Sequence, residues 1–93
     1  MMTIIDDVTL RKGYWHILRE PVGYLTDLDE IDENLADYFA SVGVIAYGIN
    51  SHAQLRYKVT PDGERIARIE FTSLSLKLFR ESKNHTQTTS FIQ

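Results

Sequence analysis

The chain has 93 residues, of which 43% are hydrophobic and 25% are charged, and it contains no cysteine. This length suffices for one domain with a modest core and leaves little room for a deep cleft between two lobes. The lack of cysteine excludes disulfide bonds and thiolate metal sites. No apolar run approaches the length of a membrane span, and residues 1–5 are too short for the core of a signal peptide. We therefore expect a cytoplasmic protein with no membrane partner.

The net charge of −3 is unevenly distributed along the chain. Residues 1–50 hold three basic and nine acidic side chains, whereas residues 51–93 hold seven basic and four acidic ones. This asymmetry fits a protein with one face that contacts an anion, and it also fits the ordinary solvated charges of helices and loops.

Residues 6–19 are predicted to form the first helix. Asp6 or Asp7 provides the N-cap, and apolar side chains at positions 10, 14, 17 and 18 recur at helical spacing. Pro21 ends the segment because it has no amide proton and disfavours helical geometry at the preceding residue.

Residues 27–42 show the clearest helical pattern. Thr26 is the expected N-cap, the first turn is acidic, and Gly43 lies where a helix end is expected. One face carries the apolar side chains Ile31, Leu35, Tyr38, Phe39 and Val42. The segment is predicted as one helix or as two short helices, because residues 32–34 could interrupt it.

Residues 44–60 are predicted to form an antiparallel hairpin. Leu55, Tyr57 and Val59 alternate with polar residues as in a half-buried strand, and residues 48–53 supply the turn. Arg56 and Lys58 would then lie on the outer face of this strand.

The segment after Thr60 allows two interpretations. Thr60 and Pro61 suit the N-cap and first position of a helix, but residues 73–78 also alternate as a strand would. As a helix, the segment would have two apolar faces. One face carries Ile66, Ile69 and Leu76, and the nearly opposite face carries Phe71, Leu74 and Leu78.

The order of the elements favours the helix. The chain contains Leu35-x-x-Tyr38-Phe39-x-x-x-Gly43-Val44-Ile45, then the hairpin, then Arg56-Tyr57-Lys58-Val59-Thr60-Pro61-Asp62-Gly63-Glu64-Arg65-Ile66-Ala67. This arrangement resembles the second half of small winged helix-turn-helix regulators of the PadR and MarR type. Their recognition helix often ends in Gly-Leu-Ile, a β-wing follows, and the next helix opens with Tyr-x-Leu-Thr-Pro-x-Gly.

The resemblance covers residues 8–80 and implies a mainly α fold with a β-hairpin wing. The winged-helix domain would span residues 1–81, with helix over residues 61–80, and residues 82–93 would form a polar C-terminal tail. The alternative is an α+β fold with an antiparallel meander. We expect the following residues in the core: Ile17, Leu18, Leu35, Phe39, Val42, Ile45, Leu55, Tyr57, Val59 and Ile66.

The resemblance also implies a transcription regulator that binds double-stranded DNA. The wing tip and nearby basic side chains are the candidate contacts: Asn50, Ser51, His52, Arg56, Lys58, Arg65 and Arg68. A homodimer is expected, with Phe71, Leu74 and Leu78 at its interface and Phe91 or Ile92 packed nearby, because this face would otherwise meet water.

The acidic second helix departs from the pattern of a DNA-binding protein. Asp32, Glu33 and Asp37 lie at or near the positions that would enter a major groove, where carboxylates repel phosphates. The alternative function is therefore a non-catalytic protein-interaction module or inhibitor of a viral or phage-like kind. It would bind a basic protein through Asp29, Glu30, Glu33 and Asp37.

The sequence contains no motif typical of an enzyme. It has no glycine-rich phosphate loop and no nucleophile elbow, and His16, His52 and His85 have no mutual spacing typical of metal ligands. We expect no catalytic residue, no cofactor, no metal and no small-molecule substrate.

Overall fold

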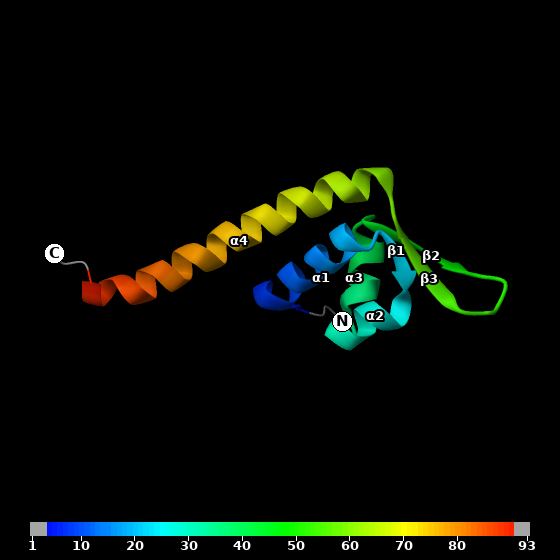
Figure 1. Cartoon of the computed structure of the whole chain (residues 1–93), viewed down its shortest axis with the longest axis horizontal. Coiled ribbons are helices and arrows are strands. Elements are labelled where there is room, and N and C mark those ends of the chain that lie inside the picture. The colour runs from blue at the N-terminus through cyan, green and yellow to red at the C-terminus, as the bar shows by residue number, and fades with distance from the viewer. Residues whose placement is uncertain (1–3, 91–93) are drawn as a thin grey trace.

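The computed structural model describes the backbone of residues 4–90 and the side chains of residues 4–83. These residues form an α+β fold with four helices and a three-stranded antiparallel sheet (Figure 1). The elements in chain order are α1 (Asp7–Arg19), β1 (Val22–Tyr24), α2 (Leu25–Ile31), α3 (Leu35–Ser41), β2 (Ile45–Ile49), β3 (Leu55–Val59) and α4 (Pro61–Ser90). Within the described residues, no helix combines the length and the apolar character needed to cross a membrane.

Helix α1 confirms the prediction for residues 6–19. Asp6 is its N-cap, and the side chain of Asp6 accepts a hydrogen bond from the Thr9 amide at 2.9 Å. Pro21 follows the C-cap residue Glu20 and introduces β1, a short strand that was not predicted.

The segment predicted as one helix or two short helices, residues 27–42, forms two short helices, α2 and α3. Asp32 caps the end of α2, and its side chain accepts a hydrogen bond from the Asn34 amide at 2.8 Å. The expectation that Thr26 is the N-cap was wrong. Helix α2 begins directly after β1, so Tyr24 occupies the cap position. Gly43 follows α3 with a φ of 79°, a conformation that glycine adopts without steric cost.

The sheet has the order β1-β3-β2, so β3 is the central strand. The predicted hairpin over residues 44–60 is confirmed as β2 and β3, with Tyr57 opposite both Tyr47 and Gly23. A Cβ atom at Gly23 would lie 2.9 Å from the Tyr57 ring, so glycine is what lets β1 approach this side chain. The Tyr57 hydroxyl donates a hydrogen bond to the Glu20 carbonyl at 2.6 Å.

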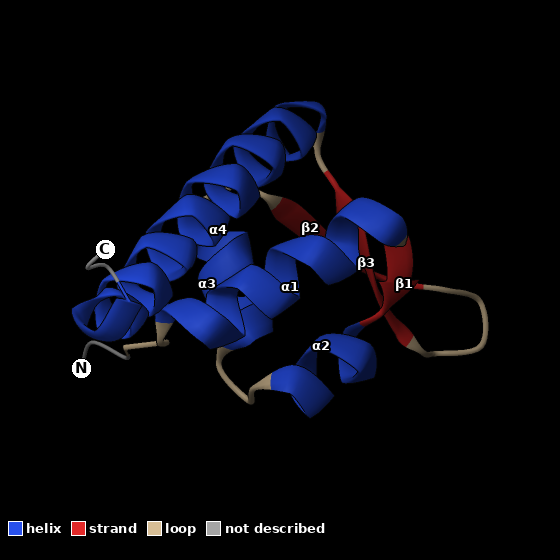
Figure 2. Cartoon of the chain, turned by 60° about the vertical axis from the view of Figure 1, so that its left-hand side comes forward, coloured by secondary structure: helices blue, strands red, loops and turns tan. Residues whose placement is uncertain are grey.

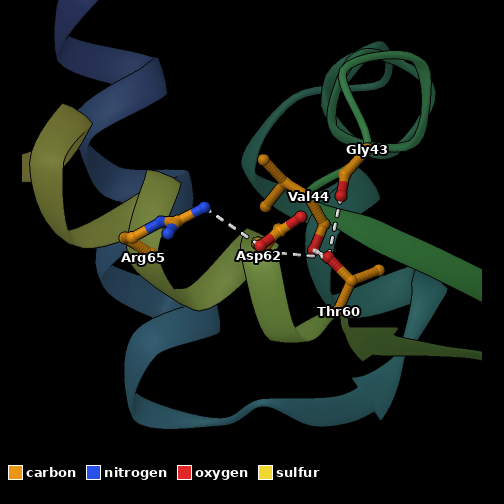
Figure 3. Close-up of polar contacts among 6 residues, drawn as sticks. Gly43, Val44, Thr60, Asp62 and Arg65 are labelled. Atoms are coloured by element: carbon orange, nitrogen blue, oxygen red, sulfur yellow. Dashed lines mark hydrogen bonds and ion pairs between the residues drawn. The ribbon is translucent and has the colours of Figure 1, made fainter.

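Helix α4 confirms the helical interpretation of residues 61–80 and excludes the antiparallel meander. Thr60 is its N-cap, because the Thr60 hydroxyl oxygen accepts a hydrogen bond from the Gly63 amide at 2.8 Å. The same hydroxyl donates to the Gly43 carbonyl at 2.8 Å, which ties the start of α4 to the end of α3 (Figure 3). The helix continues past the boundary expected at residue 81, and residues 91–93 lie outside the described part.

Helices α1 and α4 run side by side (Figure 2). Arg11 Nε donates to Ser75 Oγ at 2.7 Å, and Lys77 Nζ lies 2.7 Å from Asp7 Oδ2. The rings of Trp15 and Phe71 stack with centroids 5.2 Å apart. Beyond α1, the second half of α4 extends away from the other elements (Figure 1).

The inner face of α4 differs from the expected one. Leu74 is 8% exposed, and Phe71 is half-buried against the core, whereas Ile69 is 60% exposed. Phe71, Leu74 and Leu78 therefore belong to the side that faces the rest of the chain, and their expected place on a free dimer surface was wrong. The buried Gly63 and Ala67 lie on this same side and allow close approach.

The core prediction was correct for five residues that are buried: Ile17, Leu35, Phe39, Ile45 and Tyr57. Leu18, Val59 and Ile66 are partly buried. Val42 and Leu55 are exposed, because Val42 caps the end of α3 and Leu55 opens β3 next to the hairpin turn. The other core residues were not predicted: Tyr14, Leu25, Leu28, Ala36, Val44, Ala67 and Leu74.

Candidate functional site

Residues 20–55 have an unusual charge composition. They contain seven acidic residues and neither lysine nor arginine. This segment forms β1, α2, α3, β2 and the hairpin turn, so the surface of these elements has no basic side chain of its own except His52. Such a surface repels phosphates and attracts cationic groups.

Four carboxylates of this segment form what we term the acidic face: Asp29, Glu30, Glu33 and Asp37. All four are exposed, on α2, on the turn after it and on α3. Tyr47 on β2 joins the hairpin to this face, because its hydroxyl donates a hydrogen bond to Asp37 Oδ1 at 2.7 Å. Partial burial raises the pKa of Tyr47 to about 12, and the neighbouring carboxylates of Asp37 and Asp29 add to the shift. The phenol therefore remains a donor at neutral pH.

An exposed apolar pair adjoins Tyr47 on the same face of the β2–β3 hairpin. Ile49 lies opposite Leu55 in the β2–β3 register, and both point to the side of the sheet that carries Tyr47 and the buried Tyr57. Ile49 is 68% exposed and Leu55 is 53% exposed. The acidic face thus has two aliphatic side chains and an aromatic ring beside it.

The opposite side of the sheet is basic. Arg56 and Lys58 alternate with Tyr57 on β3, and Lys58 lies between Val22 and Ala46 in the register. The Arg56 guanidinium lies 4.3 Å from the centroid of the Tyr24 ring, and Arg56 Nε donates to the Gly23 carbonyl at 3.1 Å. Lys58 is exposed and has no ion pair or hydrogen bond within the described part of the chain.

The predicted residues at the hairpin tip have different roles. Asn50 Oδ1 accepts hydrogen bonds from the amides of His52 and Gln54, at 2.9 and 3.0 Å. Asn50 therefore builds the turn. Ser51 and His52 are exposed and available for contacts.

Arg65 and Arg68 lie apart from the hairpin tip, on α4. Their guanidinium groups pair with carboxylates of the same helix, Asp62 at 3.0 Å and Glu64 at 2.9 Å (Figure 3 shows the pair with Asp62). Helix α4 begins at the base of the hairpin and runs away from its tip (Figure 1). The structure therefore divides the seven candidate DNA contacts among the hairpin tip, the outer sheet face and α4.

Comparisons with family models, curated proteins and solved structures find no match to this chain. Function is therefore inferred from the surfaces described above.

One cluster of possible metal ligands occurs among the described side chains: His16, Glu20 and Asp27. This group was not predicted from the sequence, because the spacings between histidines do not reveal it. His16 and Glu20 are four residues apart at the end of α1, which is a detectable signal, but Asp27 comes from the next helix. The other two histidines do not join the cluster: His52 is on the hairpin tip, and the side chain of His85 is outside the described part.

Proposed function

We propose that this chain is a non-catalytic binding domain whose acidic face contacts a basic protein. The observation that carries the proposal is the absence of lysine and arginine from residues 20–55, which build α2, α3 and most of the hairpin. The exposed side chains of Tyr47, Ile49 and Leu55 would add apolar contacts beside the carboxylates. Aromatic and aliphatic side chains bordered by charges are typical of protein–protein interfaces.

The proposed fold assignment is a winged helix. The order helix, strand, two helices, hairpin and long helix supports it, with α3 in the place of the recognition helix and the β2–β3 hairpin in the place of the wing. In a DNA-binding member of this fold, α3 would face the major groove. Here α3 has seven residues, and its exposed charged residue is Asp37. We therefore propose that α2 and α3 contact a basic protein and not the phosphates of DNA.

The test uses a lysine-rich amphipathic peptide as the probe, with its affinity measured by fluorescence anisotropy at several salt concentrations. The double variant Asp29→Asn with Glu33→Gln should weaken binding at least tenfold. The double variant Asp62→Asn with Glu64→Gln on α4 is the matched control, because it removes the same charge elsewhere, and it should change the affinity less than threefold. Equal losses in both variants would show that the acidic face has no specific role.

DNA binding through the hairpin is the second candidate function. The observation in its favour is the basic outer face of β3, where Lys58 is unpaired within the described residues and Arg56 is held by Tyr24. In this mode Arg56 and Lys58 would neutralise backbone phosphates. Binding of generic duplex DNA should then be strongest at low ionic strength.

Duplex DNA distinguishes the two functions. If the hairpin binds DNA, the double variant Arg56→Ala with Lys58→Ala should lower the slope of log affinity against log salt by about one unit per lost contact. Charge reversal of Glu33 and Asp37 should strengthen non-specific binding in that case. No DNA binding at low ionic strength would exclude this function and leave the protein-interaction domain.

Self-association through α4 is part of the proposal, but on a different face from the one expected. Ile69, Leu76 and Phe79 are exposed at spacings of seven and three residues, as in the seam of a two-stranded coiled coil. Two copies of this seam would cover each other. Sedimentation equilibrium at tens of micromolar should give the mass of a dimer, and Leu76→Glu with Phe79→Glu should give a monomer. A monomeric wild-type protein would contradict the assembly.

A further inference from the structure

The end of α1 and the start of α2 bring three potential metal ligands together. His16 lies in the last turn of α1, Glu20 is the C-cap residue of that helix, and Asp27 lies in the first turn of α2. One nitrogen of His16 and one oxygen of each carboxylate all lie within 4.8 Å of one another. The distance between His16 Nε2 and Glu20 Oε1 is 4.0 Å.

The imidazole of His16 has an unsatisfied nitrogen. Nε2 is shielded from solvent and has no hydrogen-bond partner in the described part of the chain. The side chain as a whole is 21% exposed, so another edge of the ring reaches water while Nε2 faces the carboxylates. A buried polar atom without a partner destabilises a fold, and such atoms often mark the place of an ion or water.

The two carboxylates are available to bind a cation. Asp27 is half-buried and has no hydrogen bond or ion pair with any described residue. The Glu20 carboxylate has the His16 ring beside it and is 50% exposed. The Glu20 backbone is fixed independently, because its carbonyl accepts the hydrogen bond from Tyr57. The Glu20 side chain is therefore free to turn while its backbone stays in place.

We propose that His16, Glu20 and Asp27 form a site for Zn²⁺, with water in the remaining position. One imidazole nitrogen with two carboxylate oxygens is a donor set that suits zinc, whereas calcium and magnesium prefer oxygen ligands alone. Zinc–ligand distances of about 2.1 Å place tetrahedral ligand atoms about 3.4 Å apart. The observed separations are somewhat longer, and rotation of the Glu20 and Asp27 side chains shortens them.

A metal in this place would connect two helices across β1. It would neutralise the charges of Glu20 and Asp27 and hold the first turn of α2, the helix that carries Asp29 and Glu30 of the acidic face. The competing occupant is a water molecule hydrogen-bonded to Nε2, since such a water satisfies this nitrogen equally well. The experiment separates these two occupants.

The experiment is a calorimetric titration of the chelator-treated full chain with ZnCl₂ at neutral pH, followed by thermal unfolding with and without zinc. One Zn²⁺ per chain is expected. At a free zinc concentration one hundred times the dissociation constant, the folding equilibrium constant should rise about 100-fold. Substitution with Co²⁺ should give the visible absorption bands of a four-coordinate site with nitrogen and oxygen ligands.

The variants locate the site. Asp27→Asn and His16→Gln should each weaken zinc binding at least tenfold, and His52→Gln on the exposed hairpin tip is the control that should leave it unchanged. If His16→Gln fails to fold, Asp27→Asn and Glu20→Gln, which replace partly exposed carboxylates, still test the site. No zinc binding by the wild-type chain, or binding that survives both carboxylate changes, would overturn the proposal.

Discussion

The replacement of Gly63 by alanine tests how α4 is joined to the rest of the fold. A Cβ atom at position 63 would lie 2.1 Å from the Val44 carbonyl oxygen and 2.8 Å from the Val44 carbonyl carbon. Both are backbone atoms, so no side-chain rotation relieves the contact. The first turn of α4 must instead move by about 1 Å, which is a form of overpacking.

The magnitude follows from the contacts that this movement breaks. The Thr60 amide donates to the Val44 carbonyl at 3.0 Å, and the Thr60 hydroxyl donates to the Gly43 carbonyl at 2.8 Å. Each hydrogen bond contributes about 0.5–1.5 kcal/mol, and overpacking costs about 1–3 kcal/mol. The higher helix propensity of alanine returns at most about 1 kcal/mol. We expect Gly63→Ala to lower the free energy of unfolding by about 2–4 kcal/mol.

Urea denaturation provides the assay, with the midpoint compared at constant m-value. Gly48→Ala on β2 is the control, because a Cβ atom there meets nothing within 4 Å, and its effect should stay within about 0.5 kcal/mol. A Gly63→Ala protein as stable as the wild type, or more stable, would refute the close packing of α4 on Val44.

Two further predictions concern the core. Burial raises the pKa of Tyr57 to about 12, with a contribution from the charge of Glu20, so the protonated phenol stabilises the fold fully below pH 10 and less as the pH rises from 10 to 12. Tyr57→Phe should flatten the loss of stability over this range in urea titrations, and an unchanged slope would contradict the assignment. Leu74→Ala should lower the free energy of unfolding by about 2–5 kcal/mol, since Leu74 is buried. Leu76→Ala on the exposed face should change the free energy of unfolding of the monomer by less than about 1 kcal/mol. Equal effects of Leu74→Ala and Leu76→Ala would contradict the described orientation of α4.

The sequence predicted the elements that have strong local signals. Asp6 caps α1, Gly43 ends α3, and Thr60 caps α4, each through a contact between residues that are neighbours in the chain. The hairpin was predictable for the same reason, because alternation of apolar and polar residues and a turn define it locally.

The features that the sequence failed to predict depend on distant partners. Strand β1 has three residues and no alternation that stands out, and it is defined by its pairing with β3 more than thirty residues later. The inner face of α4 was wrongly assigned because both faces are apolar. The choice between them is set by the small residues Gly63 and Ala67, which hydrophobic periodicity does not weigh.

The candidate site was partly predictable. The four carboxylates of the acidic face were identified from their position in an acidic helix. Tyr47 and the pair of Ile49 and Leu55 were missed, because their exposure depends on where the helices end relative to the hairpin. The separation of Arg65 and Arg68 from the hairpin tip depends on the direction of α4, which no local pattern specifies.

The position of β3 in the sheet has a consequence for how the chain folds during synthesis. The central strand is the last strand to leave the ribosome, so β1 has no partner until residue 58 has been made. The packing of α1 is completed later still, because the Phe71 ring that stacks on Trp15 belongs to α4. A nascent chain that stops before α4 therefore lacks one of the surfaces that cover α1, while Tyr14 of this helix already has Phe39 of α3 beside it. We therefore expect the native structure of this domain to form late, and we expect no N-terminal fragment to persist as a folded intermediate.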